Sequence, residues 1–150
     1  MISRAILILP RLFLGIIFLV AVYFKWVSRN LPVQIGGFLS QTLPGATSVY
    51  RDFAHAVIVP HLPAVATPVL ICETFVAFAM LLGVTTRLAS AVAIFLLVNY
   101  MLAKGMALWL PGSNDAADIV IALIVGVGAA GRVWGIDAIL AKRYPRVLLW

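Results

Sequence analysis

Glu73 is the residue whose position points most clearly to a chemical role. It is the only acidic or basic residue in residues 63–84, PAVATPVLICETFVAFAMLLGV, and lies near their middle. A helix of this length crosses a hydrocarbon layer of about 30 Å, because it rises about 1.5 Å per residue. An unpaired carboxylate at that depth costs on the order of 2.5–3.5 kcal/mol. We therefore expect a cation, an amide or a ligand beside Glu73.

The candidate partners are polar side chains in the other apolar segments of the chain. They are Arg11 and Lys25, then Asn99 and Lys104, and finally Asp118. If successive helices run up and down, Asn99 reaches the depth of Glu73, and Arg11 lies about 7 Å deeper, within reach of its long side chain. We predict a polar lining that opens to the outer side of a membrane. In it Glu73 relays protons and the five other residues bind a ligand.

Each of these residues also has a structural interpretation. Glu73 and Arg11 can form an ion pair that only fixes the register of two helices. Lys25 and Lys104 can be anchors whose ammonium groups reach the membrane surface. Asp118 can be a first-turn acid that is favoured by the helix dipole.

Metal and thiol chemistry have little support in the sequence. His55 and His61 are six residues apart, which is not a helical metal spacing, and no third ligand is evident, so no metal site is expected. The single cysteine, Cys72, excludes an internal disulfide and a CxxC redox pair. No motif for a catalytic serine, a phosphate loop or haem attachment appears. We expect no intrinsic cofactor.

The composition indicates an integral membrane protein. Of 150 residues, 64% are hydrophobic and 11% are charged, and the mean hydropathy is +1.12. A soluble domain is about half apolar and about a quarter charged. The cations are scattered, without a basic run interleaved with aromatic residues, so nucleic acid is not an expected partner. The expected surroundings are a lipid bilayer.

The hydropathy pattern predicts an all-α fold, a bundle of four transmembrane helices in a single domain, residues 1–150. The predicted spans are residues 5–27, 63–84, 86–109 and 116–133. Residues 28–62 are expected to form a long outer loop that carries a short interfacial helix. Residues 134–150 are expected to form an amphipathic tail on the membrane surface.

The distribution of basic residues predicts the orientation. With four spans, both termini lie on one side of the membrane. That side carries most of the cations: Arg4, Arg87, Arg132, Lys142, Arg143 and Arg146. Because cytoplasmic segments are rich in Lys and Arg, we expect both termini in the cytoplasm and the chain in the inner (plasma) membrane.

Short motifs spread over nearly the whole chain suggest a family. They are RLFLGIIF with Arg11 and Gly15, then Lys25, Glu73, LLGVTTR at 81–87, Asn99, and Gly131-Arg132 followed by GID at 135–137. Together they resemble the DoxX-like family of small four-helix membrane proteins, related to the membrane subunit of thiosulfate:quinone oxidoreductase. The resemblance implies quinone-coupled or sulfur-redox electron transfer, often beside another subunit. Since no redox cofactor motif is evident, electrons would pass through a quinone or a partner's cofactor.

Three functions follow as hypotheses, and all remain open at this level, as does whether the chain is itself catalytic. The first is a membrane subunit of a quinone-linked or sulfur-redox oxidoreductase, with Glu73 as proton relay and Arg11 or Lys104 holding an anionic species. The second is a non-catalytic scaffold or assembly subunit, suggested by small residues at 126–131 that favour close helix packing. The third is a small-solute or proton-coupled transporter, although four spans are few and no inverted repeat is visible.

Overall fold

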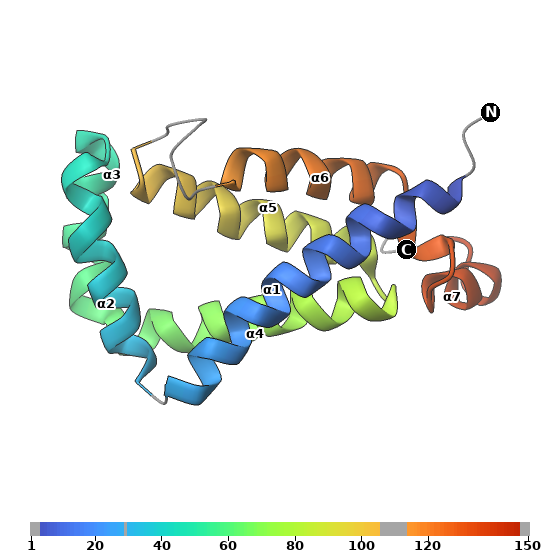
Figure 1. Ribbon diagram of the computed structural model, residues 1–150, viewed down its shortest axis with the longest axis horizontal. Coiled ribbons are helices and arrows are strands. Elements are labelled where there is room, and N and C mark those ends of the chain that lie inside the picture. The colour runs from blue at the N-terminus through green and yellow to red at the C-terminus, as the bar shows by residue number, and fades with distance from the viewer. Residues whose placement is uncertain (1–3, 29, 106–113, 148–150) are drawn as a thin grey trace.

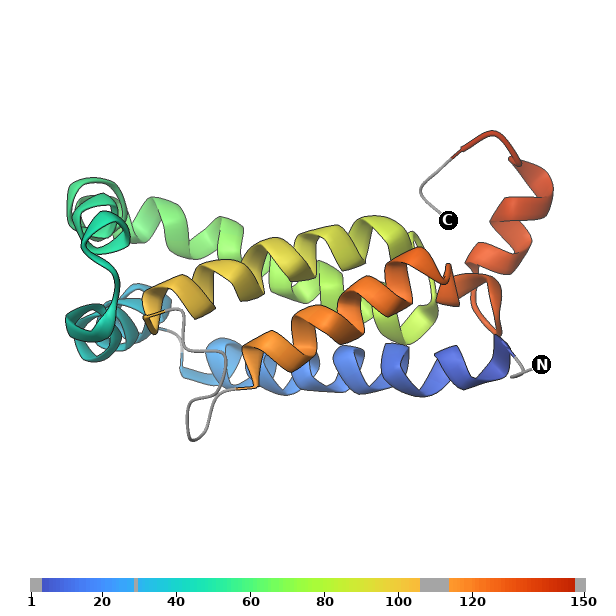
Figure 2. The same cartoon turned by 90° about the horizontal axis from the view of Figure 1, so that it is seen from above.

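The computed structural model describes residues 4–28, 30–105 and 114–147, and the regular structure within them is entirely helical. Four long helices lie along the long axis of the molecule (Figure 1): α1 (Ile8–Ser28), α4 (Leu62–Leu82), α5 (Thr86–Ala103) and α6 (Asp115–Val127). They lie side by side when seen from above (Figure 2). The predicted all-α class is confirmed.

Short helices close the two ends of this bundle. At one end, α2 (Leu31–Thr42) and α3 (Ser48–Phe53) stand across the long axis (Figure 1). The tight turn η2 (Leu43–Gly45) joins them, and η3 (Ala54–Ile58) and η4 (Val59–His61) lead from α3 into α4. At the other end lie η1 (Arg4–Leu7), η5 (Ala130–Arg132) and α7 (Asp137–Arg143). We refer to these as the α2 end and the α7 end.

The segment predicted as an outer loop is mostly helical. Pro32 falls in the first turn of α2, where the missing N–H disturbs no helical hydrogen bond. The helices at this end enclose a small core of their own. It contains Leu39, Leu43, Ala46, Tyr50 and Ala54 and includes Ala103 from α5. Burial of this apolar face holds α2 and α3 against the bundle, although the local sequence is rich in Gly and Pro.

Small residues let the long helices approach closely. A Cβ added at Gly126 of α6 would lie 2.8 Å from the Cβ of Ser90 of α5, and one added at Gly15 of α1 would lie 2.9 Å from the side chain of Leu81. Real Cβ atoms do not approach neighbours so closely, so a side chain at either position would force a neighbouring side chain or helix to shift. The main core between the helices is correspondingly rich in alanine, including Ala77, Ala93 and Ala122.

Three helical stretches are long and apolar enough to cross a membrane: Ala5–Val27, Ser48–Leu82 and Thr86–Ala103. α6 has 13 residues and rises only about 20 Å. The predicted fourth span, residues 116–133, is not one continuous helix. The helix ends at Val127, and Ala129 adopts a left-handed backbone with φ 47°. Of the predicted third span, residues 106–109 lie outside the described residues.

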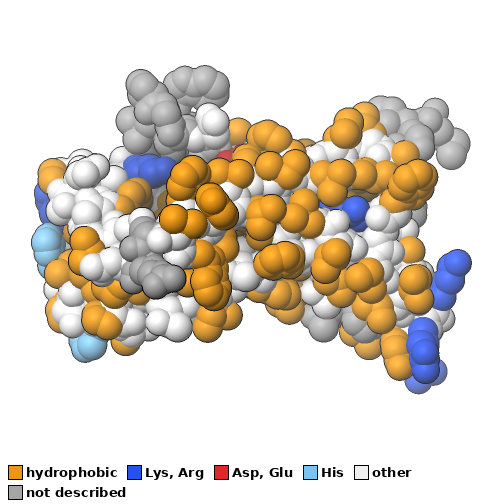
Figure 3. Space-filling model, turned by 60° about the horizontal axis from the view of Figure 1, so that its bottom comes forward, with side chains coloured by type: hydrophobic (Ala, Val, Ile, Leu, Met, Phe, Trp, Pro, Cys, Tyr) orange, Lys and Arg blue, Asp and Glu red, His pale blue; other side chains and the backbone are white. Residues whose placement is uncertain are grey.

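The surface has the distribution expected of a membrane protein. Large apolar side chains are exposed along the long helices, among them Leu9 at 71%, Ile71 at 62% and Phe95 at 66%. Figure 3 shows hydrophobic side chains over the length of the bundle, with Lys and Arg side chains projecting at the α7 end and histidine at the α2 end. An exposed apolar surface this extensive requires lipid or another protein around it.

Candidate functional site

Glu73 lies on the buried face of α4, with 1% of the residue exposed. Its Oε1 atom accepts a hydrogen bond from the ammonium of Lys25 on α1 and another, at 2.5 Å, from the hydroxyl of Tyr100 on α5. Helices α1 and α5 thus each contribute one donor to the same carboxylate oxygen on α4. The buried acid has the cation that its position demands, and that cation is Lys25.

The second oxygen of this carboxylate, Oε2, is buried and has no hydrogen-bond partner among the residues that the structure describes. A buried acceptor left without a donor costs about 1–3 kcal/mol, and more when it carries charge. Native structures satisfy nearly all such atoms. A proton on Oε2, or a ligand that donates to it, would remove this cost. Glu73 is therefore both anchored through one oxygen and available for chemistry at the other.

Lys25 links this buried carboxylate to the surface of the bundle. The Lys25 side chain is 22% exposed, whereas that of Glu73 is 2% exposed. The Lys25 ammonium also lies 5.8 Å from the centre of the Tyr100 ring, within the range of a cation–π contact. The lysine therefore extends from the partly exposed surface of the bundle to the buried acid.

A second charged pair lies next to this cluster, toward the α2 end. The ammonium of Lys104 lies 2.8 Å from a carboxylate oxygen of Asp115, at the start of α6. Phe38 of α2 packs edge-on against the Tyr100 ring, with centroids 6.1 Å apart, and its own ring lies 6.0 Å from the Lys104 ammonium. Asp118, in the first turn of α6, is 7% exposed. Aromatic and charged contacts thus connect Glu73 to the helices at the α2 end.

Asn99 is not the hydrogen-bond partner of Glu73 that the sequence suggested. Its side-chain amide donates at 2.8 Å to the carbonyl of Phe95, one turn earlier in the same helix. The neutral group at the carboxylate is instead the hydroxyl of the next residue, Tyr100. The sequence contained a signal for this, because Tyr100 and Lys104 are four residues apart and therefore share a helix face. Asn99 and Lys104 are five apart.

The predicted ion pair between Arg11 and Glu73 is wrong. Arg11 lies about 21 Å along α1 from Lys25, and so near the α7 end. Its guanidinium donates at 3.1 Å to the backbone carbonyls of Ala130, Val133 and Trp134. Carbonyls beyond a helix C-terminus lack intrahelical partners, and an arginine can satisfy several of them at once. Arg11 thus holds the chain that follows α6.

Asp137 completes this structure at the α7 end, and sequence reasoning gave it no role. The residue is fully buried, and its carboxylate accepts hydrogen bonds from the Thr85 N–H at 2.6 Å, the Thr86 N–H at 2.9 Å and the Thr86 hydroxyl at 2.6 Å. It therefore caps the N-terminus of α5 from a distant part of the chain. No local capping pattern could reveal it, since the two segments are 51 residues apart.

Glycines allow the segments around Arg11 and Asp137 to meet. Gly83 has φ 65°, and a Cβ there would lie 2.5 Å from Arg11 Nη1 and 2.7 Å from the Cα of Gly135. The Gly83 carbonyl accepts a hydrogen bond from the Asp137 N–H at 2.8 Å. The sequence motifs at 81–87, 131–132 and 135–137 thus form one structural junction at the α7 end, separate from Glu73.

Comparison with known families identifies this architecture. The family described as TQO small subunit DoxD, where TQO is thiosulfate:quinone oxidoreductase, matches residues 6–149. No match was found among curated proteins. None was found among solved structures. The family match includes both the Glu73 cluster and the junction at the α7 end.

Proposed function

This chain belongs to the DoxD family of thiosulfate:quinone oxidoreductase small subunits, and on that basis we propose that it is a membrane subunit that exchanges protons with quinone at Glu73. The observation that carries the proposal is the carboxylate itself. One of its oxygens is held by Lys25 and Tyr100, and the other is buried without a partner among the described residues. An ionisable side chain buried within a membrane-spanning segment marks a functional site more often than a structural one.

The residues of the cluster fit a quinone head group. A quinone carbonyl accepts hydrogen bonds, and the Lys25 ammonium is a donor with three N–H groups, whereas the single hydroxyl proton of Tyr100 is given to Glu73. The surrounding side chains that pack on the core, among them Val69, Cys72 and Phe75, are apolar and suit a hydrocarbon tail. Bound quinone would supply the electron-accepting chemistry. The chain itself supplies binding, orientation and a proton-exchanging group.

In this proposal each residue has a defined task. Glu73 gains or loses a proton at Oε2. Lys25 balances the negative charge when that proton is absent, and Tyr100 fixes the carboxylate through Oε1. Lys104 and Asp118, nearer the α2 end, provide polar groups between the site and the surface. Electrons come from a partner redox subunit, since no redox cofactor motif is evident in the chain.

The proposed topology places this site toward the outer side of the inner membrane. The four long helices each cross the membrane, with α6 completing its crossing through the turn at 128–133. The basic side chains at the α7 end (Figure 3) support a cytoplasmic position for both termini. Glu73 then exchanges protons with the outer side by way of the α2 end.

The test is Glu73→Gln, in membranes that contain the complete complex. We expect thiosulfate-dependent reduction of decylubiquinone to fall by roughly 100-fold, the effect of losing a general acid–base. Thr74→Val is the matched control, because the Thr74 hydroxyl donates only to the Leu70 carbonyl of its own helix. An unchanged rate for a folded, normally assembled Glu73→Gln variant would refute the role of Glu73.

A non-catalytic assembly subunit is the second candidate, favoured by the family description as a small subunit. It predicts co-purification with a larger partner in mild detergent and a Glu73→Gln complex of undiminished activity. A lone monodisperse protein would exclude it. Loss of activity in a complex that still assembles would favour the first candidate.

A further inference from the structure

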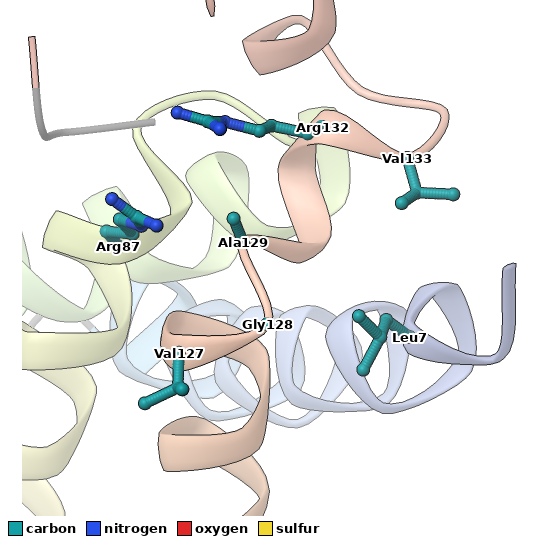
Figure 4. Close-up of a pocket in the computed structure, with 7 residues that line it drawn as sticks. All are labelled: Leu7, Arg87, Val127, Gly128, Ala129, Arg132 and Val133. Atoms are coloured by element: carbon teal, nitrogen blue, oxygen red, sulfur yellow. The ribbon is translucent and has the colours of Figure 1, made fainter. Parts of the chain in front are cut away.

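A hollow of about 380 Å³ lies at the α7 end, far from Glu73. It is bounded by the end of η1, the first turn of α5, the end of α6, and the turn and η5 that follow α6 (Figure 4). The side chains used in the argument below are Arg87, Arg132, Leu7, Val127 and Val133. The Glu73 cluster supplies none of these five, whereas Arg87, Arg132 and Val133 lie in segments that also meet at the junction around Arg11 and Asp137.

Two arginines give this hollow its charge. Arg87 comes from the start of α5 and Arg132 from the end of η5, and Figure 4 shows their side chains extending past the same side of Ala129. The left-handed backbone of Ala129, φ 47°, turns the chain from α6 into η5 and so brings Arg132 back beside Arg87. Guanidinium groups bind phosphate with paired, charge-assisted hydrogen bonds.

The positive charge comes from the arginines rather than from the helix terminus. The N–H groups of Thr85 and Thr86, at the start of α5, already donate to Asp137. They are therefore not available to an anion in the hollow. An anion bound there depends on Arg87 and Arg132.

The remaining walls are apolar and face outward. Val127 is 82% exposed, and Leu7 and Val133 also line the hollow. Trp134, next in the chain after Val133, is 87% exposed. The hollow thus combines apolar side chains with two arginines at the α7 end. A free anion gains nothing from such walls, whereas a molecule with a phosphate and hydrocarbon chains is matched by both parts.

We propose that this hollow binds the phosphate headgroup of an anionic lipid, with the adjoining hydrocarbon against Leu7 and Val127. Basic pockets between transmembrane helices at the cytoplasmic face are suited to such headgroups. The site holds one lipid at the α7 end and ties that end to the headgroup layer. This inference does not rest on quinone chemistry.

The test compares binding of short-chain phosphatidylglycerol and phosphatidylcholine to the purified full-length protein, by native mass spectrometry and by titration. For Arg87→Gln/Arg132→Gln we expect affinity for phosphatidylglycerol to fall about five-fold per arginine, roughly 25-fold in all. Lys142→Gln/Arg143→Gln removes the same charge from exposed positions outside the hollow and should retain the affinity. Arg87→Lys/Arg132→Lys keeps the charge and the fold, and should weaken binding to an intermediate extent because the paired geometry is lost.

Three results would overturn the proposal. One is equal affinity of the wild type and the Arg87→Gln/Arg132→Gln variant, with both folded by circular dichroism. Another is an equal loss in Lys142→Gln/Arg143→Gln, which would show diffuse surface charge. The third is displacement of the lipid by inorganic phosphate at equal concentration, which would show a site for the ion alone.

Discussion

At the scale of single residues, breaking the Lys25–Glu73 pair lowers the stability of the protein by more than the intact pair raises it. Two charges removed from water gain little net stability from each other, but either one alone is strongly unfavourable. Glu73 is fully enclosed and Lys25 is partly exposed, so the acid is the member that cannot be rehydrated. The chemistry proposed for Oε2 therefore depends on Lys25 remaining in place.

We predict that Lys25→Met destabilises the protein by about 3–5 kcal/mol, because it leaves the Glu73 carboxylate buried without its cation. Lys25→Met/Glu73→Leu should recover much of that loss, since both charges are then absent. Unfolding in mixed micelles, followed by circular dichroism, measures both. If the double variant is no more stable than Lys25→Met, the two side chains are not coupled.

Lys25 pairs with Glu73 and Arg11 does not, and this difference shows how far residue types alone predict a contact. The need for a cation at Glu73 follows from the sequence. So do the three candidate cations, Arg11, Lys25 and Lys104. The choice between them depends on helix tilt and on which carbonyls are left unpaired after α6, and both arise from tertiary packing. Arg11 donates to three such carbonyls. No sequence pattern near position 11 predicts these contacts.

At the scale of helices, the start of α5 depends on a residue from a distant segment. Thr85, at the N-cap position of α5, makes no side-chain capping bond, and Asp137 supplies the acceptors instead. The same contact holds η5 and α7 against the bundle. The α5 terminus and the tail should therefore loosen together.

We predict that Asp137→Asn lowers stability by about 2–3 kcal/mol, because three donors lose a charged acceptor in a fully buried place. Amide hydrogen exchange should rise both at 84–88 and at 137–143. Asp52→Asn, at an exposed position of α3, is the control and should change neither. Faster exchange in the tail alone would show that the capping contact does not support α5.

The close approach of α5 and α6 gives a second prediction for helices. Gly126→Ala would place its Cβ against Ser90, so the two helices must separate or repack, at a cost of about 1–3 kcal/mol. Gly37→Ala in α2 is the matched control. A Cβ there meets nothing within 4 Å, and alanine favours the helix by up to about 1 kcal/mol. Opposite effects on the thermal midpoint are expected, and a stabilised Gly126→Ala variant would contradict this packing.

The helices themselves were predictable to different degrees. The stretch Ala5–Val27 is apolar throughout and matches the predicted span, and α4 and α5 begin within a residue of prediction. α2 was not predicted as a long helix, because its stability comes from burying Leu39 against α5 and its neighbours and not from its local sequence. The end of α6 was misplaced because small residues continue the apolar pattern beyond Val127 while the backbone turns.

At the scale of the whole molecule, the two ends have different chemical character. The α7 end carries Arg87, Arg132, Lys142, Arg143 and Arg146 together with the hollow that we propose binds lipid. The α2 end carries the helices that cover the Glu73 cluster, and its cations are accompanied by acids, as in the Lys104–Asp115 pair. In the proposed topology, this asymmetry determines which side of the membrane exchanges protons with the site.

We predict that His55 is accessible from outside the cell and Lys142 only from the cytoplasm, because segments rich in Lys and Arg stay inside. The measurement places single cysteines in a Cys72→Ser background, as His55→Cys and Lys142→Cys, and labels intact spheroplasts with a membrane-impermeant maleimide. His55→Cys should label at once, and Lys142→Cys only after permeabilisation. The reverse pattern would show that the protein has the opposite orientation in the membrane. Glu73 would then exchange protons with the cytoplasm, and the anionic lipid would have to lie in the outer leaflet, so one experiment tests the geometry on which both sites depend.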